Sequence, residues 1–170
     1  YSQMLADAVK QKQGKKVPKR SDSEIDLEIE AFLPSTYIED SQQKIEFYKR
    51  LRQVDSTDGL MDVVDDLIDR FGEYPTEVAN LIQITELKLH ADAAQVEKIE
   101  RKNGNLFITL TPAASQRISG ENVFAALSVT KLRATVAESN DKMHIKLVIQ
   151  PQMTQQDWFE QLMSYVKKLA

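Results

Sequence analysis

The sequence contains no cysteine, and this absence excludes several kinds of chemistry. A chain of 170 residues without a thiol forms no disulfide, has no thiolate nucleophile and offers no thiolate to a metal. The two histidines, His90 and His144, lie far apart, and neither belongs to an HExxH motif. No apolar run approaches the ~18 residues that a membrane-spanning helix needs. We therefore predict a soluble protein without a membrane partner.

Glycine is also scarce, and its five copies are scattered. No GxxxxGK[ST] loop is present to hold phosphates, and no GxSxG motif to hold a nucleophile. The adjacent acids Asp65 and Asp66 are candidates for a divalent metal, but successive helical residues point about 100° apart, so their carboxylates diverge. We predict no catalytic residue, no cofactor site and no metal site.

The net charge of −4 conceals an uneven distribution. Residues 1–20 have six basic residues and one acid, whereas residues 21–100 have seven basic residues and twenty acids. Residues 101–170 return to a basic excess, nine against five. An acidic middle region repels DNA and attracts a basic protein surface.

The most informative stretch runs from Asp55 to Pro75. Its apolar residues recur at the spacing of one helical face: Leu60, Val63, Val64, Leu67, Ile68 and Phe71. Four acids recur on the opposite face: Asp62, Asp65, Asp66 and Asp69. Residues 56–58 supply candidate N-caps, Gly72 suits the end of a helix, and Pro75 suits the first turn of the next one. The pattern predicts a capped helix with one core face and one acidic face turned outward.

Two further elements are predicted before this helix. Residues 1–20 read as an entry helix followed by a basic linker, and residues 21–170 as one domain. Apolar and acidic residues alternate over 25–31, which predicts a strand with one buried and one acidic face. Asp40 and Gln43 predict a capping box that opens a helix reaching Val54, whose basic side can pair with the acidic helix.

The remainder predicts one long helix and two hairpins. The helix after Pro75 is apolar around most of its circumference, which indicates packing on more than one side. Strands are expected around Asn103-Gly104 and again around Asn140-Asp141. A helix near Glu121–Leu127 follows the first hairpin, and one capped by Thr154 follows the second. The fold class is therefore α+β, with N-terminal helices packed on a largely antiparallel sheet made of one early strand and two hairpins.

Specific residues within this pattern resemble a known family. Asp69, Arg70, Phe71 and Gly72 followed by Pro75, and preceded by the run Phe47-Tyr48-Lys49-Arg50, are similar to the C-terminal domain of the bacterial transcription-repair coupling factors. The resemblance covers about the first 95 residues, with matches also at Tyr1, Met4, Leu5, Ile38, Val78 and Leu81. The second half is similar by pattern only.

The resemblance implies a function for the chain. Its parent would be a cytoplasmic, ATP-dependent DNA translocase of superfamily 2 that displaces stalled RNA polymerase and recruits UvrA in nucleotide excision repair. This domain would pack on the UvrB-like N-terminal module, mask the UvrA-binding surface and restrain the motor. ATP and Mg would bind in the motor domains, and no direct DNA binding is expected here. Asp66 matches the acidic residue that faces the UvrB-like module, and Asp62, Asp65 and Asp69 are further docking candidates.

Two alternatives stay open at this point. The acids can be a solvated helix face, with Asp66 and Arg70 paired at i, i+4. Alternatively, the chain is a nucleic-acid-binding accessory module that uses basic residues of the 10–20 segment. Those residues are Lys10, Lys12, Lys15, Lys16, Lys19 and Arg20.

Overall fold

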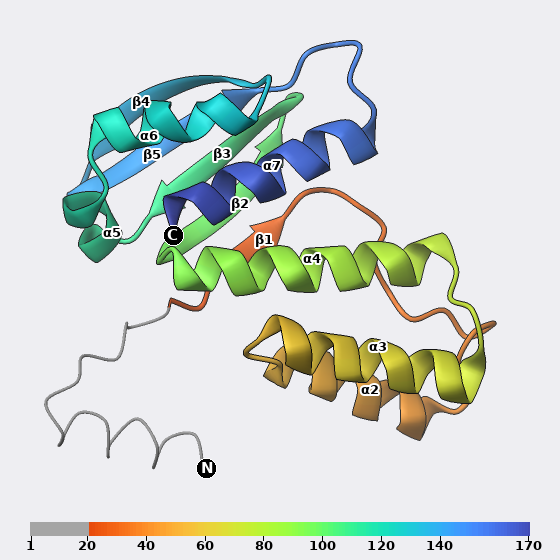
Figure 1. The fold of residues 1–170 in the computed structure, drawn as a ribbon. Helices are drawn as coiled ribbons and strands as arrows, with labels where there is room; N and C mark the ends of the chain where they lie inside the picture. The colour runs from red at the N-terminus through yellow and green to blue at the C-terminus, as the bar shows by residue number, and fades with distance from the viewer. Residues whose placement is uncertain (1–20) are drawn as a thin grey trace, which may run out of the picture.

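The computed structural model describes residues 21–170. The predicted entry helix and basic linker, residues 1–20, lie outside the described residues. The order of elements is β1 (Glu24–Asp26), α2 (Ser41–Gln53), α3 (Thr57–Phe71), α4 (Thr76–Ala93), β2 (Val96–Lys102), β3 (Asn105–Leu110), α5 (Pro112–Arg117), α6 (Gly120–Ala125), the short 3-10 helix η1 (Ala126–Val129), β4 (Arg133–Ser139), β5 (Lys142–Val148) and α7 (Gln155–Leu169). Figure 1 shows α2 and α3 packed beside α4, with the sheet and the remaining helices on the other side of α4. The predicted α+β class is confirmed.

One five-stranded sheet has the order β1-β2-β3-β5-β4. β1 pairs with β2 in parallel, and the other neighbours are antiparallel. Both predicted hairpins form, because their turn residues accept positive φ: 53° at Asn103 and 75° at Gly104, then 55° at Asn140 and 62° at Asp141.

The early strand is shorter than predicted. Only Glu24–Asp26 pairs with β2, because Glu28 has a φ of 56° and turns the chain out of the ladder. The predicted alternation nevertheless continues, since Leu27 and Leu33 are buried while the acids between them are exposed. The amphipathic pattern was therefore correct, but its ladder extends over fewer residues.

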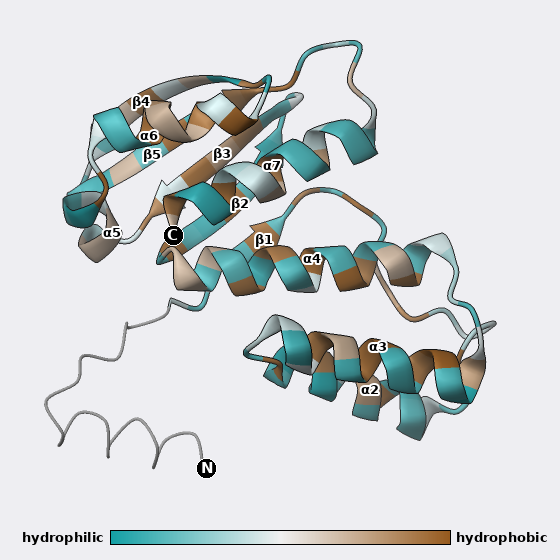
Figure 2. Ribbon diagram, viewed as in Figure 1, coloured by the Kyte–Doolittle hydropathy of each residue, from teal (hydrophilic) through white to brown (hydrophobic). Residues whose placement is uncertain are grey.

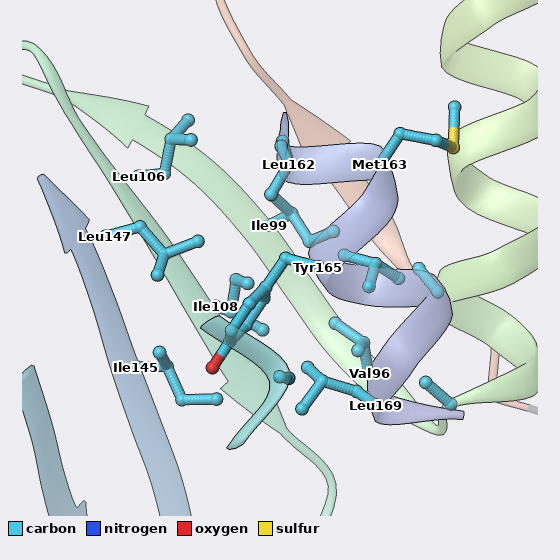
Figure 3. Packing of buried hydrophobic residues seen from close by; sticks show 14 of the residues in the cluster. Val96, Ile99, Leu106, Ile108, Ile145, Leu147, Leu162, Met163, Tyr165 and Leu169 are labelled. Carbon is cyan, nitrogen blue, oxygen red and sulfur yellow. The ribbon is translucent and has the colours of Figure 1, made fainter. Parts of the chain in front are cut away.

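Two hydrophobic clusters form the interior. The first lies between the sheet and α4 to α7, and Figure 3 shows Tyr165 of α7 pointing toward the strands. Its hydroxyl donates to the Val123 carbonyl oxygen at 3.0 Å. The second cluster lies among α2, α3 and α4. Helix α4 contributes Leu87 and Ala91 to the first cluster and Val78 and Leu89 to the second, which confirms that it packs on more than one side.

The helices after the two hairpins differ. The second hairpin leads to α7, which begins with the predicted cap Thr154 in a capping box with Asp157. The single helix predicted near residues 121–127 was wrong in its extent: the chain forms α5, α6 and η1. Extended backbone at Ile118 and Ser119 separates α5 from α6, and the Ser119 side chain caps α6.

Candidate docking surface

Helix α3 has the limits that its sequence predicts. The Ser56 hydroxyl accepts a hydrogen bond from the Gly59 N–H at 3.0 Å, so Ser56 is the N-cap. The helix ends at Gly72, whose φ of 82° and ψ of −163° belong to a region that only glycine enters readily. The Gly72 N–H donates to the Ile68 carbonyl oxygen at 2.9 Å. Pro75 is the N-cap of α4, one position earlier than predicted.

The end of α3 is held by Tyr37, a residue that the sequence analysis missed. Its hydroxyl donates to the carbonyl oxygens of Gly72, at 2.7 Å, and Leu67, at 3.2 Å. The Phe71 ring is half-buried and lies 5.7 Å from the Tyr37 ring and 5.6 Å from the Phe47 ring, measured between centroids. Burial raises the pKa of Tyr37, so the hydroxyl stays a donor at neutral pH. The Phe71–Gly72 motif therefore fixes the helix end against α2.

The core face of α3 is narrower than predicted. Leu60, Val63, Val64 and Leu67 are buried. Ile68, expected in the core, is 44% exposed, and Met61 is 50% exposed. Ile68 lies about 80° around the helix axis from Leu60, toward the outer edge of the apolar stripe, where neither α2 nor α4 covers it.

Three of the four candidate acids face outward. Asp62, Asp65 and Asp69 are exposed, and none forms an ion pair with a residue in the described range 21–170. Asp65 and Ile68 follow Met61 at i+4 and i+7, so the three residues lie on one side of the helix. We call Met61, Asp62, Asp65, Ile68 and Asp69 the acidic face. Figure 2 shows hydrophilic and hydrophobic bands side by side along α3.

Asp66 is placed differently from the other acids. Its carboxylate forms an ion pair with Arg50 of α2 at 2.8 Å, so the predicted pairing of the basic and acidic helices is confirmed. This pair replaces the alternative Asp66–Arg70 pair. The guanidinium groups of Arg50 and Arg70 instead lie 5.2 Å and 5.5 Å from the centre of the Phe47 ring. Asp66 therefore lies at the α2 border of the acidic face and is still 46% exposed.

An apolar pair surrounded by carboxylates is typical of a protein-binding surface. Burial of Met61 and Ile68 would supply the hydrophobic contact, and the acids would select a basic partner. Among residues 21–170, no group of three or more His, Cys, Asp or Glu side chains is arranged to hold a metal ion. The same residues include no helix long and apolar enough to cross a bilayer. The alternative candidates between Lys10 and Arg20 lie outside the described residues.

Comparisons with known proteins agree with the resemblance. The family model for the TRCF domain matches residues 27–120, which include all of α3. A transcription-repair-coupling factor of Staphylococcus epidermidis is 43% identical over 149 residues, which are 86% of this chain and 13% of the relative. One from Staphylococcus aureus is 40% identical over 169 residues, which are 98% of this chain and 14% of the relative.

A solved structure extends the likeness to the second half of the chain. The crystal structure of the C-terminal domain of transcription-repair coupling factor superposes with a TM-score of 0.82 at 35% identity, covering 89% of this chain and 93% of that one. The chain thus spans about a seventh of the curated relatives but nearly all of the solved domain. The chain belongs to the TRCF domain family, the C-terminal domain of the transcription-repair coupling factors.

Proposed function

We propose that this chain is the regulatory docking domain of its parent protein and that the acidic face binds the parent's UvrB-like N-terminal module. Docking would cover the surface through which that module recruits UvrA, and it would restrain the motor until RNA polymerase is engaged. The observation that carries the proposal is the set of exposed carboxylates around Met61 and Ile68, in the part of the chain that matches the family model.

The parent would be a cytoplasmic ATP-dependent DNA translocase of bacterial nucleotide excision repair, as the family resemblance implies. Its ATP and Mg sites would belong to the motor domains, with this domain acting as a non-catalytic restraint. RNA polymerase and UvrA would then be indirect partners of this domain. Engagement of the polymerase would end the restraint, and docking would cover the surface that binds UvrA.

The acids would have two roles in docking. Asp62, Asp65 and Asp69 have no ion pair within residues 21–170, so they are free to meet basic groups of the partner. Asp66 already binds Arg50, but a carboxylate has two oxygens and can accept hydrogen bonds from both. Asp66 would therefore keep Arg50 and accept a partner's arginine at the rim.

Docking is tested by mixing the chain with the separately made UvrB-like module and measuring affinity as salt is varied. Close charge pairs at interfaces couple by about 1.5 kcal/mol or more, so Asp65→Lys with Asp69→Lys should weaken binding at least tenfold. Salt should weaken the wild-type complex and have less effect on the variant. Asp26→Arg, an exposed acid on β1, is the matched control and should bind normally. Equal affinity for all three proteins would show that the acidic face is only solvated.

In the full-length parent, Asp66→Arg should place a positive side chain against the basic surface of the UvrB-like module, so that the two repel each other. We expect UvrA binding without polymerase and a raised basal ATPase, because an inhibited state favoured by a few kcal/mol is then depopulated. The change also breaks the ion pair with Arg50, which costs at most about 1 kcal/mol at this exposure. Arg50→Gln breaks the same ion pair and leaves the acid in place, so it should remain inhibited. Release by Arg50→Gln as well would attribute the effect to α2–α3 packing and contradict docking through Asp66.

A further inference from the structure

The sheet has one covered face and one open face. The covered face carries buried residues from neighbouring strands, among them Ile99, Ile108 and Ile145. Helices α5, α6 and α7 lie over this side in Figure 1. Strand residues alternate between the faces, and none of the described side chains that alternate onto the other face is buried. Among residues 21–170, the second face of the sheet is therefore open to a partner.

The centre of the open face carries an aromatic ring. Phe107 of β3 is half-buried, and its register neighbours are Glu100 of β2 and Lys146 of β5. The Lys146 ammonium lies 6.0 Å from the centre of the Phe107 ring. His144 lies on the same face of β5, opposite Thr109, whose hydroxyl is 3.3 Å from its Nδ1. Phe107 and His144 are thus diagonal neighbours, a relation that puts side chains of adjacent strands about 7–8 Å apart.

Charge divides the open face into two parts. On the β1–β2 side, lysines are neutralised: Lys98 by Glu24 and Glu100, and Lys102 by Glu100. Lys142, the first residue of β5, pairs with Glu97 of β2. On the part formed by β3, β5 and β4 no carboxylate faces outward, because Glu138 is opposite Met143 and alternates to the covered side. Lys146 and Arg133 form no ion pair with any residue from 21 to 170. This part of the sheet is a basic surface around two rings.

The β4 edge of this surface carries small side chains. β4 places Thr135, Ala137 and Ser139 on the open face, and all three are exposed and small. Since β4 is the edge strand, a chain-like ligand can cross the rings and leave the sheet at Arg133. Unpaired bases stack on aromatic and histidine rings of open sheets, while lysine and arginine hold the phosphates. A duplex keeps its base faces stacked inside and cannot use such rings.

We propose that the open sheet face over β3, β5 and β4 binds single-stranded nucleic acid, with bases stacked on Phe107 and His144 and phosphates held by Lys146 and Arg133. This site is formed by other elements than the acidic face and does not depend on the docking proposal. The proposal departs from the expectation that this domain binds no DNA directly. That expectation used the charge of successive stretches of the sequence, whereas the basic surface is assembled from strands that pair in the sheet. Because residues 21–100 are strongly acidic, binding should be weak and sensitive to salt.

The test uses the full 170-residue chain and fluorescence anisotropy with labelled oligothymidine and oligouridine of about 12 nucleotides, a length within the span of one such platform. Phe107→Ala should weaken binding between about fivefold and 150-fold, the loss expected for one stacked base of about 1–3 kcal/mol. Phe107→Tyr keeps an aromatic ring at this position and should bind like the wild type. Lys146→Ala should weaken binding and reduce the salt dependence by about one released ion. The two oligonucleotides distinguish RNA from DNA as the source of the strand.

Matched controls lie on the other side of the sheet. Phe124→Ala removes an equally large ring that is 51% exposed on α6, and Lys168→Ala removes an exposed lysine of α7. Both should bind like the wild type. A further variant replaces all six basic residues between Lys10 and Arg20 by glutamine and should retain the effect of Phe107→Ala. Thermal unfolding of each variant identifies any that fail to fold.

The outcomes separate the proposal from its competitors. Loss of binding on Phe107→Ala, with rescue by Phe107→Tyr, supports it. Binding that ignores Phe107 but disappears with the 10–20 glutamine variant overturns it in favour of the basic segment. Equal competition by duplex DNA also overturns the proposal, because the bases of a duplex are already stacked on each other. Equal competition by polyglutamate overturns it too, since that polymer has no bases, and would indicate an acidic protein partner. Absence of binding at low salt overturns it outright.

Discussion

The helical half and the sheet half of this domain bury their side chains in different ways. In the sheet half, strands and α7 enclose a cluster that includes Trp158 and Tyr165, and only one sheet face is covered. In the helical half, α2 and α3 pack on each other and on α4 around Phe47 and Leu67. Helix α4 belongs to both clusters, so its apolar circumference connects them. The comparison teaches that the amphipathic helices α2 and α3 depend on a helix that is not amphipathic.

The two halves also differ in what they leave exposed. The helical half exposes Met61 and Ile68 on α3, beside the acids of that helix, and Ile45 on α2. The sheet half exposes Phe124 and Val129 on the covering helices. An apolar surface edged by charge of one sign suits a specific protein partner. The half with the smaller core therefore has the surface better suited to docking.

Removal of a central ring should test whether the two halves unfold together. Phe47 is fully buried, and its ring lies close to the Phe71 ring and to the guanidinium groups of Arg50 on α2 and Arg70 on α3. Phe47→Ala should lower the free energy of unfolding by about 3–5 kcal/mol. The loss should be seen equally by far-UV circular dichroism and by the fluorescence of Trp158, the only tryptophan, which lies in the sheet half. Urea titrations followed by both signals provide the measurement.

The matched control is Phe71→Ala, which removes the same ring from a half-buried site in the same cluster. We expect a smaller loss there than the 3–5 kcal/mol of a fully buried ring. If the Trp158 signal of Phe47→Ala unfolds at the wild-type urea concentration while the dichroism shifts, the halves are independent. That result would contradict the role given to α4.

A substitution at the end of α3 should destabilise the helical half through its backbone alone, without removing a side chain from the core. A Cβ at Gly72 would meet nothing within 4 Å, so Gly72→Ala is strained only by its φ of 82°. Residues held in this region cost about 1–3 kcal/mol. Thermal melts of the chain should show this loss. Gly120→Ala at the start of α6 also meets open space but has no positive φ, so it should be neutral or slightly stabilising. Equal melting temperatures for the two variants would contradict backbone strain at Gly72.

Periodicity and turn chemistry predicted most of the elements. Helices α2, α3, α4 and α7 and both hairpins follow from local signals: caps such as Ser56 and Thr154, and turn residues such as Asn103. These signals succeed because a cap or a turn acts within a few residues of its own position. Among the candidate sites, the outward placement of Asp62, Asp65 and Asp69 was predicted in the same way.

Other features depend on residues that are distant in the sequence. The Asp66–Arg50 pair, the hydrogen bonds of Tyr37 and the exposure of Ile68 are set by how α2, α3 and α4 pack together. No spacing rule links residue 37 to residue 72. The open basic surface around Phe107 likewise needs the order β3-β5-β4, which places Lys146 of β5 beside Phe107 and Arg133 of β4 one strand further away. Local patterns hold no information on that order.

The smallest expected effect is on pH dependence and tests the contact between α4 and the sheet half. Burial, with the charge of Lys167 on α7, lowers the pKa of His90 below its ordinary value of 6.5, while Glu86 opposes this shift. The folded state then binds fewer protons than the unfolded state as the pH falls below about 6.5, so acid should destabilise the fold through this residue. The contribution is complete above pH 6.5 and declines toward the lowered pKa. Urea midpoints at about pH 7.5 and 5.5 should therefore differ more for the wild type than for His90→Gln, which cannot take up a proton. Lys167→Gln removes one of the causes and should give an intermediate difference. If His90→Gln loses as much stability on acidification as the wild type, then His90 titrates alike in the folded and unfolded states. That result would contradict an effect of α7 on this side of α4.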